Sequence, residues 1–257
     1  MNYSIYQAPI YSFYKKDFYK SVGQDGKGTG FLHLFALFCA CWTAIIISCY
    51  IHMILIVDSP QVNELVQKLP DMTFRNGILS INKPSPYEMV IDGKKIVFDT
   101  SGKYKGADEI EGVAALVTEE QISFSDQAWR EPANFKGLVT GEYTLKAVDI
   151  KPFLKDISLK ISGIGFVLGV PVFFGHLFLA LVYAGIGMII NSKAGFETAL
   201  RMAISAMTPG VLLSSLLAVC WINFPGQGLL TIPLTVGLLV YGYRALTAEE
   251  TKLIMVH

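Results

Sequence analysis

Carboxylates are the side chains of this sequence whose spacing offers the most direct route to catalysis. Two acidic runs, Asp108–Glu111 and Glu119–Glu120, lie in one polar segment between residues 58 and 160. Two facing carboxylates could work as general acid and general base, as in hydrolases that act on sugars, or could supply oxygen ligands to a cation. The regular spacing of a calcium-binding loop is absent, so we interpret the runs as solvated acidic loops.

Histidine and cysteine are placed where neither a metal site nor a nucleophile is expected. The segment 58–160 contains neither residue, which removes Cys–His pairs, Ser–His pairs and histidine-based zinc sites there. His33 and His52 stand 19 residues apart, about 28 Å along a helix, and His176 belongs to another apolar stretch. We therefore predict no catalytic residue, no metal and no cofactor, and expect His176 to hydrogen-bond to a neighbouring helix. The cysteines are interpreted as small apolar packing residues: Cys39, Cys41, Cys49 and Cys220.

The run Asp99-Thr100-Ser101-Gly102 is similar to the Asp-Thr-Gly motif of aspartic proteases. The additional serine breaks that motif, and the chain has no second copy of it. Glycine and short polar side chains favour turns. We therefore interpret the run as a turn that closes a strand over residues 95–99.

The ionised side chains are few and unevenly placed, which indicates a membrane protein. The 257 residues include 21 Lys and Arg against 21 Asp and Glu, and the charged fraction of 16% is below the roughly 25% of soluble proteins. A hydrophobic fraction of 52% and a mean hydropathy of +0.45 disfavour a disordered chain. Zero net charge disfavours binding to nucleic acid.

Three stretches without Lys, Arg, Asp or Glu predict four transmembrane helices. The first has 27 residues, about 40 Å as a helix, and a hydrocarbon core is about 30 Å thick. We interpret it as a retained anchor, because it is too long for a signal peptide and no small-x-small site follows it. The third stretch contains a turn signal, Asn223–Gly228, and therefore forms two helices. The four predicted helices cover residues 31–57, 161–192, 202–224 and 228–243.

Basic residues flank these helices mainly on one side. Residues 1–30, the loop between the second and third helices, and the tail 244–257 together carry eight basic residues, whereas the turn between the last two helices carries none. The positive-inside rule therefore predicts a multi-pass protein of the bacterial inner (cytoplasmic) membrane, with both termini cytoplasmic and residues 58–160 outside. Three lysines next to the second helix oppose this orientation: Lys151, Lys155 and Lys160.

Residues 1–30 are predicted to form a cytoplasmic amphipathic helix followed by a flexible glycine-rich linker. Aromatic side chains recur at helical spacing and lysines alternate with them, a pattern typical of helices that lie on a lipid surface. Packing of this helix against the cytoplasmic ends of the other helices is an equally good interpretation. The residues of the predicted membrane surface are Tyr11, Tyr14, Lys15, Lys16, Phe18 and Lys20.

The segment 58–160 is predicted to be β-rich, so that the fold class is four transmembrane α-helices with an α+β extracytoplasmic domain inserted between helices 1 and 2. Alternating apolar residues flank Asp92-Gly93, which is a hairpin signal. Short helices are expected over Val62–Leu69 and Lys151–Lys160. The expected strands cover residues 77–83, 87–91, 95–99, 113–118, 121–125 and 142–150.

The second to fourth apolar helices are rich in small residues and prolines. Small residues four apart, as at Gly165 and Gly169, let helices approach closely, and prolines such as Pro209 break the backbone ladder. Bent helices could line a cavity, but simple packing is the better interpretation. The residues assigned to helix packing are Gly165, Gly169, His176 and Pro209.

Two motif runs resemble a bacterial membrane protein family of unknown function. They are residues 74–87, with Asn-Gly, Leu-Ser-Ile and Pro-Ser-Pro-Tyr, and residues 96–103, with Asp-Thr-Ser-Gly-Lys. Some members in Gram-positive bacteria are described as maltodextrin utilisation proteins, and the last three helices are distantly similar to the Yip-type membrane bundle. The resemblance implies four helices with one large outer loop and no established catalytic residue.

The leading functional hypothesis is a non-enzymatic accessory or scaffold subunit, whose outer domain binds a ligand or a partner. The expected partners are membrane lipids and another membrane protein or a second copy of the chain, and no nucleic acid. One alternative is a transport or lipid-handling component with a cavity between helices 2–4, and another is a carboxylate-dependent envelope hydrolase. The candidate binding residues are Asn76, Pro84, Pro86, Tyr87, Asp99 and Gly102.

Overall fold

The computed structural model of the chain describes residues 7–24, 30–91, 93–125, 132–137, 141–222 and 225–254. It divides into two compact units, which we call the helical unit (Met1–Tyr50 and Ile161–His257) and the β unit (Ile51–Lys160). Parts of three predicted features lie outside the described residues: Asp92 of the hairpin turn, residues 25–29 of the linker, and residues 223–224 of the turn between the last two helices.

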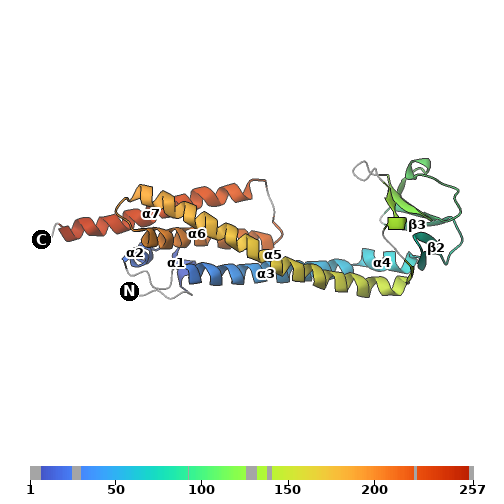
Figure 1. Ribbon diagram of the computed structural model, residues 1–257, viewed down its shortest axis with the longest axis horizontal. Helices are drawn as coiled ribbons and strands as arrows, with labels where there is room; N and C mark the ends of the chain where they lie inside the picture. Colours follow the sequence, from blue (N-terminus) through green and yellow to red (C-terminus); the bar gives the residue numbers. More distant parts are fainter. Residues whose placement is uncertain are drawn as a thin grey trace. The chain divides into compact units, whose positions relative to one another are not determined.

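Four helices are long and apolar enough to cross a membrane, as predicted. Many of their apolar side chains are exposed, as in helices whose surroundings are hydrocarbon. Figure 1 shows them running along one another in the helical unit. All described strands fall between the first and second of these helices in the sequence, so the chain is an α+β membrane protein. The helices are α3 (Phe31–Val57), α5 (Ala147–Ile190), α6 (Phe196–Val219) and α7 (Gln227–Ile254).

α3 has the predicted bounds, whereas the boundaries of the other three helices differ, because a charged residue ends an apolar stretch without ending a helix. α5 joins the predicted short helix 151–160 to the predicted transmembrane helix 161–192 in one helix of 44 residues, about 66 Å long. α6 begins at Phe196 rather than at residue 202, and Arg201 pairs with Glu197 (2.7 Å) in its first turns. α7 continues to Ile254 rather than ending at residue 243.

The N-terminal helices α1 (Ala8–Tyr11) and α2 (Lys16–Gln24) belong to the helical unit. α2 lies against α6 and α7, and Figure 1 shows it beside the orange and red helices. Its buried residues Phe18, Tyr19 and Val22 share a hydrophobic cluster with Met202, Leu239 and Tyr243. α2 is therefore held by packing against α6 and α7.

The core of the bundle combines aromatic residues with alanines. Leu34 and Phe38 of α3 pack with Phe173 of α5, and alanines of α5 and α6 extend the same cluster. Alanine lets two helix backbones approach closely, which is the usual basis of helix association in a bilayer. The alanines in the cluster are Ala180, Ala184, Ala199 and Ala203.

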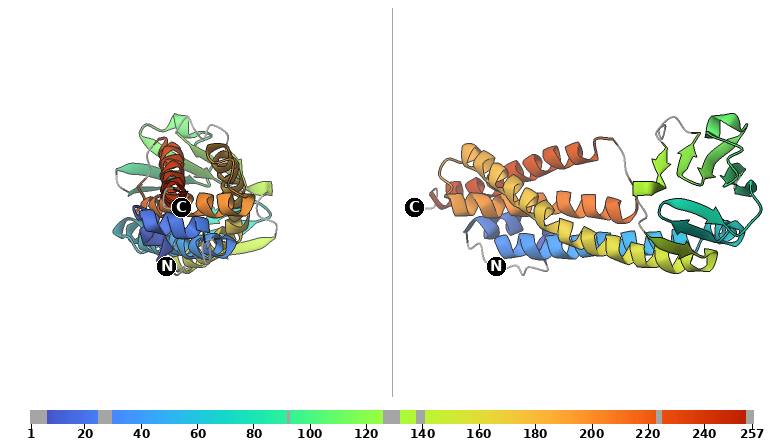
Figure 2. Two further views of the ribbon diagram at one scale, coloured as in Figure 1. Left: turned by 90° about the vertical axis from the view of Figure 1, so that its left-hand side faces the viewer. Right: turned by 45° about the vertical axis from the view of Figure 1, so that its right-hand side comes forward.

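The β unit contains two sheets. The smaller has the order β2 (Ile78–Ile81), β1 (Met72–Arg75), β8 (Glu142–Leu145), with both pairs antiparallel. The larger has the order β3 (Tyr87–Ile91), β4 (Lys94–Asp99), β5 (Val113–Thr118), β6 (Gln121–Phe124), β7 (Ala133–Asn134). The hairpins β3–β4 and β5–β6 match the predicted strands, and β4 and β5 pair in parallel. Figure 2 shows the teal strands of the smaller sheet apart from the green strands of the larger one.

Short helices complete the β unit. α4 (Pro60–Lys68) begins after Ser59, whose hydroxyl accepts a hydrogen bond from Val62 N. The 3₁₀ helices η1 (Ala107–Glu109) and η3 (Phe135–Gly137) lie in the connections after β4 and β7. The last strand ends at Leu145 rather than at residue 150, because α5 starts at Ala147, whose amide donates to the Asp71 carboxylate (3.0 Å).

The larger sheet has apolar side chains on both faces. Leu79, Met89, Phe98 and Val117 form one cluster. Val97 and Leu116, which adjoin Phe98 and Val117 in their strands, pack in a second cluster with Val113 and with Ala107 of η1. Successive strand residues point to opposite faces, so β4 and β5 are covered on both sides, and β4 ends at a buried carboxylate, Asp99.

Candidate functional site

The carboxylate of Asp99 organises the turn that follows β4. Its Oδ1 accepts hydrogen bonds from Ser101 N (2.9 Å), Ser101 Oγ (2.6 Å) and Ser85 Oγ (3.2 Å), and its Oδ2 accepts one from Tyr104 N (2.7 Å). The Ser85 hydroxyl also accepts from Thr100 N (2.8 Å). Four donors therefore satisfy the carboxylate, and one of them, the Ser85 hydroxyl, joins the first motif run to the second.

These hydrogen bonds keep Asp99 ionised. Desolvation by burial acts to raise the pKa of this carboxyl, but the hydrogen bonds from Ser101, from the Tyr104 amide and from Ser85 outweigh it and lower the pKa below its usual value. A general acid in a hydrolase needs the opposite shift. The geometry therefore indicates that Asp99 stabilises the turn after β4 and does not act as a general acid.

Two other candidate residues of the β unit stabilise local structure. The side chain of Tyr87 donates to the Lys68 carbonyl (2.8 Å) and so binds β3 to the C-terminal end of α4. Asn76 lies in the β1–β2 hairpin with a positive φ of 53°, and its backbone N–H donates a hydrogen bond to Gly141 O (2.9 Å). A side chain on the adjacent Gly77 would overlap the backbone of Lys136, so this turn requires glycine.

The structure brings some of the candidate binding residues together and separates others. Pro84 and Pro86 flank Ser85, and therefore lie beside the Asp99 turn. Gly102 belongs to that turn and has a φ of 75°, which favours glycine. Asn76 lies in the turn between β1 and β2 of the smaller sheet. Sequence reasoning missed Ser85, because no local pattern shows that a residue 14 positions away donates to this carboxylate. It also missed Tyr104, because the donor there is a backbone N–H.

A polar recess of about 340 Å³ borders the Asp99 turn. One wall is this turn, with Gly102, Tyr104 and Lys105, and the other is the tight β5–β6 turn from Thr118 to Gln121. Thr118 Oγ1 donates to Gln121 O (3.1 Å) and accepts from Gln121 N (3.2 Å), which fixes the second wall. We call this feature the β-unit recess. Its charges are mixed, since Lys105 lies opposite Glu119 and Glu120.

The acidic run Asp108–Glu111 has a structural contact of its own. Glu109 Oε2 accepts a hydrogen bond from Lys105 N (3.0 Å) and so closes the loop before η1. Among the described residues, no three His, Cys, Asp or Glu side chains are grouped so that they could hold a metal ion.

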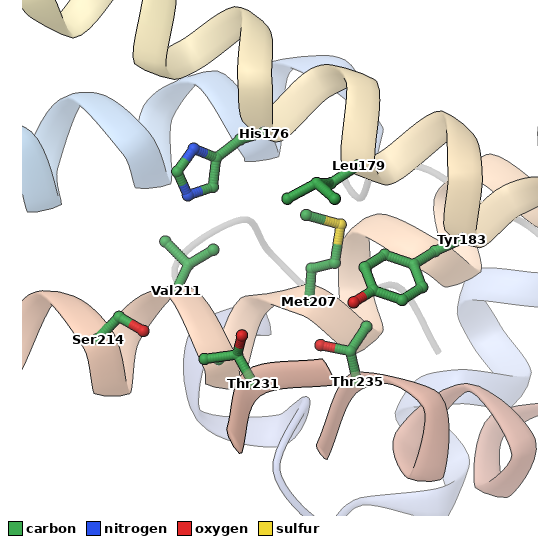
Figure 3. A pocket seen from close by; sticks show the side chains of 9 residues that line it. His176, Leu179, Tyr183, Met207, Val211, Ser214, Thr231 and Thr235 are labelled. Carbon is green, nitrogen blue, oxygen red and sulfur yellow. The ribbon is translucent and has the colours of Figure 1, made fainter. Parts of the chain in front are cut away.

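A second candidate site is a cavity of about 70 Å³ between α5, α6 and α7, which we call the bundle cavity. Figure 3 shows His176 and Tyr183 reaching into it from α5, Ser214 and Val211 from α6, and two threonines from α7. Gly210 lies where α6 meets α7, and a Cβ there would stand 3.4 Å from Thr231 Cβ. The polar lining residues are His176, Tyr183, Ser214, Thr231 and Thr235.

The His176 ring makes its hydrogen bond within its own helix, not to a neighbouring helix as expected. Its Nδ1 lies 2.9 Å from Val172 O, one turn earlier in α5. A carbonyl can only accept, so Nδ1 carries the proton and Nε2 is an acceptor in the neutral ring. The ring also packs against Phe38 of α3, with 5.6 Å between the ring centroids.

The bond between two helices is made by another histidine. His33 Nε2 lies 3.1 Å from Thr208 Oγ1, and both side chains are buried. Thr208 Oγ1 donates to Ile204 O (3.0 Å), so the His33 Nε2–H is the donor to Thr208. This bond joins α3 to α6 next to Pro209, whose missing N–H already breaks the α6 ladder.

An apolar groove of about 390 Å³ lies between α3 and α5. Gly165 and Gly169 of α5 allow the approach of α3: Trp42 Nε1 donates to Gly165 O (3.2 Å), and a Cβ on Gly169 would overlap the Trp42 indole. The groove is lined mainly by aromatic side chains, including Phe35, Phe38, Trp42, Phe166 and Phe173.

The residues assigned to the membrane surface fall into two groups. Tyr14 is 61% exposed, Lys16 is exposed, and Lys15 lies over the Tyr11 ring at 4.2 Å. Phe18 is completely buried and contacts protein, which corrects its assignment to the lipid surface. The spacing that places Tyr11, Tyr14 and Phe18 on one face does not show which neighbour covers that face.

Tyr19, which was not among the predicted residues, fixes α2 to its surroundings. Its hydroxyl donates to Ser12 O (2.6 Å), and burial raises its pKa. Tyr241 of α7 donates to Tyr14 O (3.1 Å) beside it. The hydroxyls of Tyr19 in α2 and Tyr241 in α7 thus both bind the segment between α1 and α2, through the carbonyls of Ser12 and Tyr14.

The lysines at the start of α5 are paired with acids. Asp58 lies 2.9 Å from Lys155 and 3.5 Å from Lys151, and Asp156 lies 2.6 Å from Lys160. The hydrogen bond from Lys155 is the main cause that lowers the pKa of Asp58. All five side chains are partly exposed, so each pair contributes at most modestly to stability.

The chain was compared with known proteins. No curated protein matches it, and no solved structure matches it. One family model, described as "Protein of unknown function (DUF1189)", matches residues 6–243, which include all four apolar helices up to Tyr243 and the whole β unit. The chain therefore belongs to the DUF1189 family of proteins of unknown function.

Proposed function

We propose that the protein is a multi-pass protein of the bacterial inner membrane, with both termini in the cytoplasm and the β unit outside. The basic residues on the short segments support this orientation, because such residues remain on the cytoplasmic side. The three lysines that opposed it, Lys151, Lys155 and Lys160, each lie within ion-pair distance of an aspartate.

Labelling of introduced cysteines tests this orientation. In a chain with its four native cysteines replaced by serine, a membrane-impermeant maleimide added to intact cells should label Lys83→Cys in the β unit. It should label Lys16→Cys in α2 only after the membrane is permeabilised. Both side chains are exposed, so burial does not bias the comparison. The reverse pattern would show that the orientation is wrong.

We further propose that the β unit binds a partner protein, and that the protein is a non-enzymatic accessory subunit of a membrane complex. The observation that carries this proposal is the β-unit recess. Hydrogen bonds fix both of its walls in advance, so little conformational entropy would be lost on binding. Its mixed charges suit a polar segment of a partner.

A pull-down from membranes in a mild detergent tests the proposed binding. The intact chain should recover a stoichiometric membrane partner, and Lys105→Glu should weaken that recovery about tenfold, which corresponds to about 1.4 kcal/mol. Lys83→Glu is the matched control, because Lys83 is an exposed lysine of the same unit that does not line the recess. Recovery of no partner, or equal loss in both variants, would contradict the proposal.

A second candidate function is transport or lipid handling through the helical unit, and the bundle cavity favours it. Polar groups between membrane-spanning helices give a small molecule hydrogen bonds that lipid tails cannot supply. Proteoliposomes that contain the chain should pass small uncharged solutes faster than empty ones, and His176→Phe should abolish the difference. Equal rates with and without the protein would remove this candidate.

A role in maltodextrin use and a relation to the Yip-type bundle were implied only by the resemblance of the motif runs. The first stays a prediction that growth can test. A deletion strain should grow more slowly on maltodextrin than on glucose, and the chain supplied in trans should restore growth. Equal growth on both sugars would remove this role.

A further inference from the structure

Several hydrogen-bonding side chains line the bundle cavity, and the surrounding helices do not supply hydrogen-bond partners for all of them. Five polar side chains line it, and Figure 3 shows the hydroxyls of Tyr183 and Thr235 turned towards each other and His176 facing α6. Among the residues that the structure describes, no Lys, Arg, Asp or Glu lines the cavity. The site is therefore polar and contains no carboxylate, ammonium or guanidinium group.

Two of these groups have no protein partner in the part of the chain that the structure describes. His176 uses Nδ1 for the bond to Val172 O, which leaves Nε2 as an unused acceptor. Ser214 makes no hydrogen bond, whereas its neighbour Ser215 donates to Val211 O (2.7 Å). Lipid tails carry no donor or acceptor, so hydrocarbon cannot satisfy these groups.

The size of the cavity limits what it can hold. A cavity needs about 10–15 Å³ to hold one water molecule, so a cavity of about 70 Å³ has room for a few. A bound water needs two to four polar partners, and the lining supplies them from three helices. A small ion would have to give up its hydration shell with no opposite charge in the lining to replace it.

We propose that the bundle cavity is a hydrogen-bonding site within the membrane for small uncharged molecules, occupied by water when no other such molecule is present. One water donates to His176 Nε2, and the Ser214 hydroxyl bonds to the water network from α6. Small uncharged molecules would also be the solutes of the second candidate function, transport. The binding of water does not depend on that function, whereas the binding of other solutes rests on it.

Solid-state NMR of the full chain in liposomes tests the site, with water as the probe. In protein labelled with ¹⁵N-histidine, magnetisation that starts on water should reach the His176 ring, which the variant His176→Phe identifies. It should not reach His33, which is buried and bonded to Thr208. Ser214→Val places methyl groups at the cavity and should reduce the His176 signal to the level of His33.

Ser215→Val is the matched control, because Ser215 bonds to its own helix and does not line the cavity. It should leave the His176 signal unchanged, and an unchanged His33 resonance shows that each variant is folded. A wild-type His176 signal no stronger than that of His33, or equal effects of the two serine variants, would overturn the proposal. A strong His176 signal without solute flux in proteoliposomes would remove the transport function and leave the site intact.

Discussion

At the scale of single residues, Asp99 shows what local sequence can and cannot predict. The run Asp99-Thr100-Ser101-Gly102 predicts a turn after a strand, and the structure has one. The sequence does not reveal that Ser85 reaches the same carboxylate, since that contact depends on how β3 and β4 pair. Similarly, His33 was expected to be one of three separate histidines, and its partner Thr208 lies 175 residues away.

Asp99→Asn should destabilise the β unit by about 1–3 kcal/mol at neutral pH, because it removes the charge that four donors satisfy. Hydrogen exchange of β4 and β5 in the full chain, followed by mass spectrometry, measures this loss. Asp108→Asn is the control, since Asp108 is an exposed acid of the same unit. Similar exchange in the two variants would show that the hydrogen-bonded cluster does not stabilise the turn.

The pH dependence of the β unit should follow from the lowered pKa of Asp99. The unfolded chain binds a proton more readily than the folded one, so the stabilisation is complete above the unfolded pKa of about 4 and is lost as pH falls through the lower folded value. The stability difference between the wild type and Asp99→Asn should therefore shrink below about pH 4. A difference that stayed constant down to pH 2 would contradict the assigned cause.

At the scale of elements, the number of helices and the main hairpins could be predicted from the sequence, and their ends could not. A charge-free apolar stretch indicates which residues lie in hydrocarbon, but a helix can extend beyond the hydrocarbon. For this reason α5 begins 14 residues before the predicted transmembrane helix. The parallel pairing of β4 and β5 was also beyond reach, because a 13-residue connection with a 3₁₀ turn gives no pairing signal. Small residues did indicate a place of close helix approach on α5, but not that α3 is the helix that packs there.

Gly169→Ala should destabilise the helical unit by about 1–3 kcal/mol, because the new methyl group would overlap the Trp42 indole and disturb its bond to Gly165 O. Gly175→Ala is matched in helix and in chemistry, and a Cβ there meets nothing within 4 Å. The unfolding midpoints of both variants are measured in detergent. Because both variants replace glycine by alanine, the difference between their midpoints does not contain the helix propensity of alanine. Equal midpoints would show that α3 does not pack closely at Gly169.

Tyr19→Phe should loosen α2 at a cost of about 0.5–1.5 kcal/mol, because the Ser12 carbonyl loses its donor. Limited proteolysis of the N-terminal segment reports this change. Tyr14→Phe should have little effect, since the Tyr14 side chain is 61% exposed and contributes only its backbone carbonyl to the bond with Tyr241. Faster cleavage in the Tyr14 variant than in the Tyr19 variant would contradict the assignment.

At the scale of the whole molecule, a destabilising substitution in one of the two compact units should leave the other unit unaffected. Asp99→Asn should raise hydrogen exchange in the strands of the β unit and leave α6 unchanged, because its contacts lie within that unit. Gly169→Ala should raise exchange in α3 and α5 near Trp42 and leave β4 and β5 unchanged. Exchange that rose throughout the chain in either variant would show a single cooperative structure.

The burial of α2 against α6 and α7 has a consequence for synthesis on the ribosome. α2 is made about 200 residues before α7, so at ~5–20 residues per second the apolar side chains Phe18, Tyr19 and Val22 wait roughly 10 to 40 s for their partners on α7. A chain that stops before Gln227 can cover them with α6, through Met202 and Ala206, but not with α7. α2 thus remains partly exposed to chaperones and proteases until α7 has emerged.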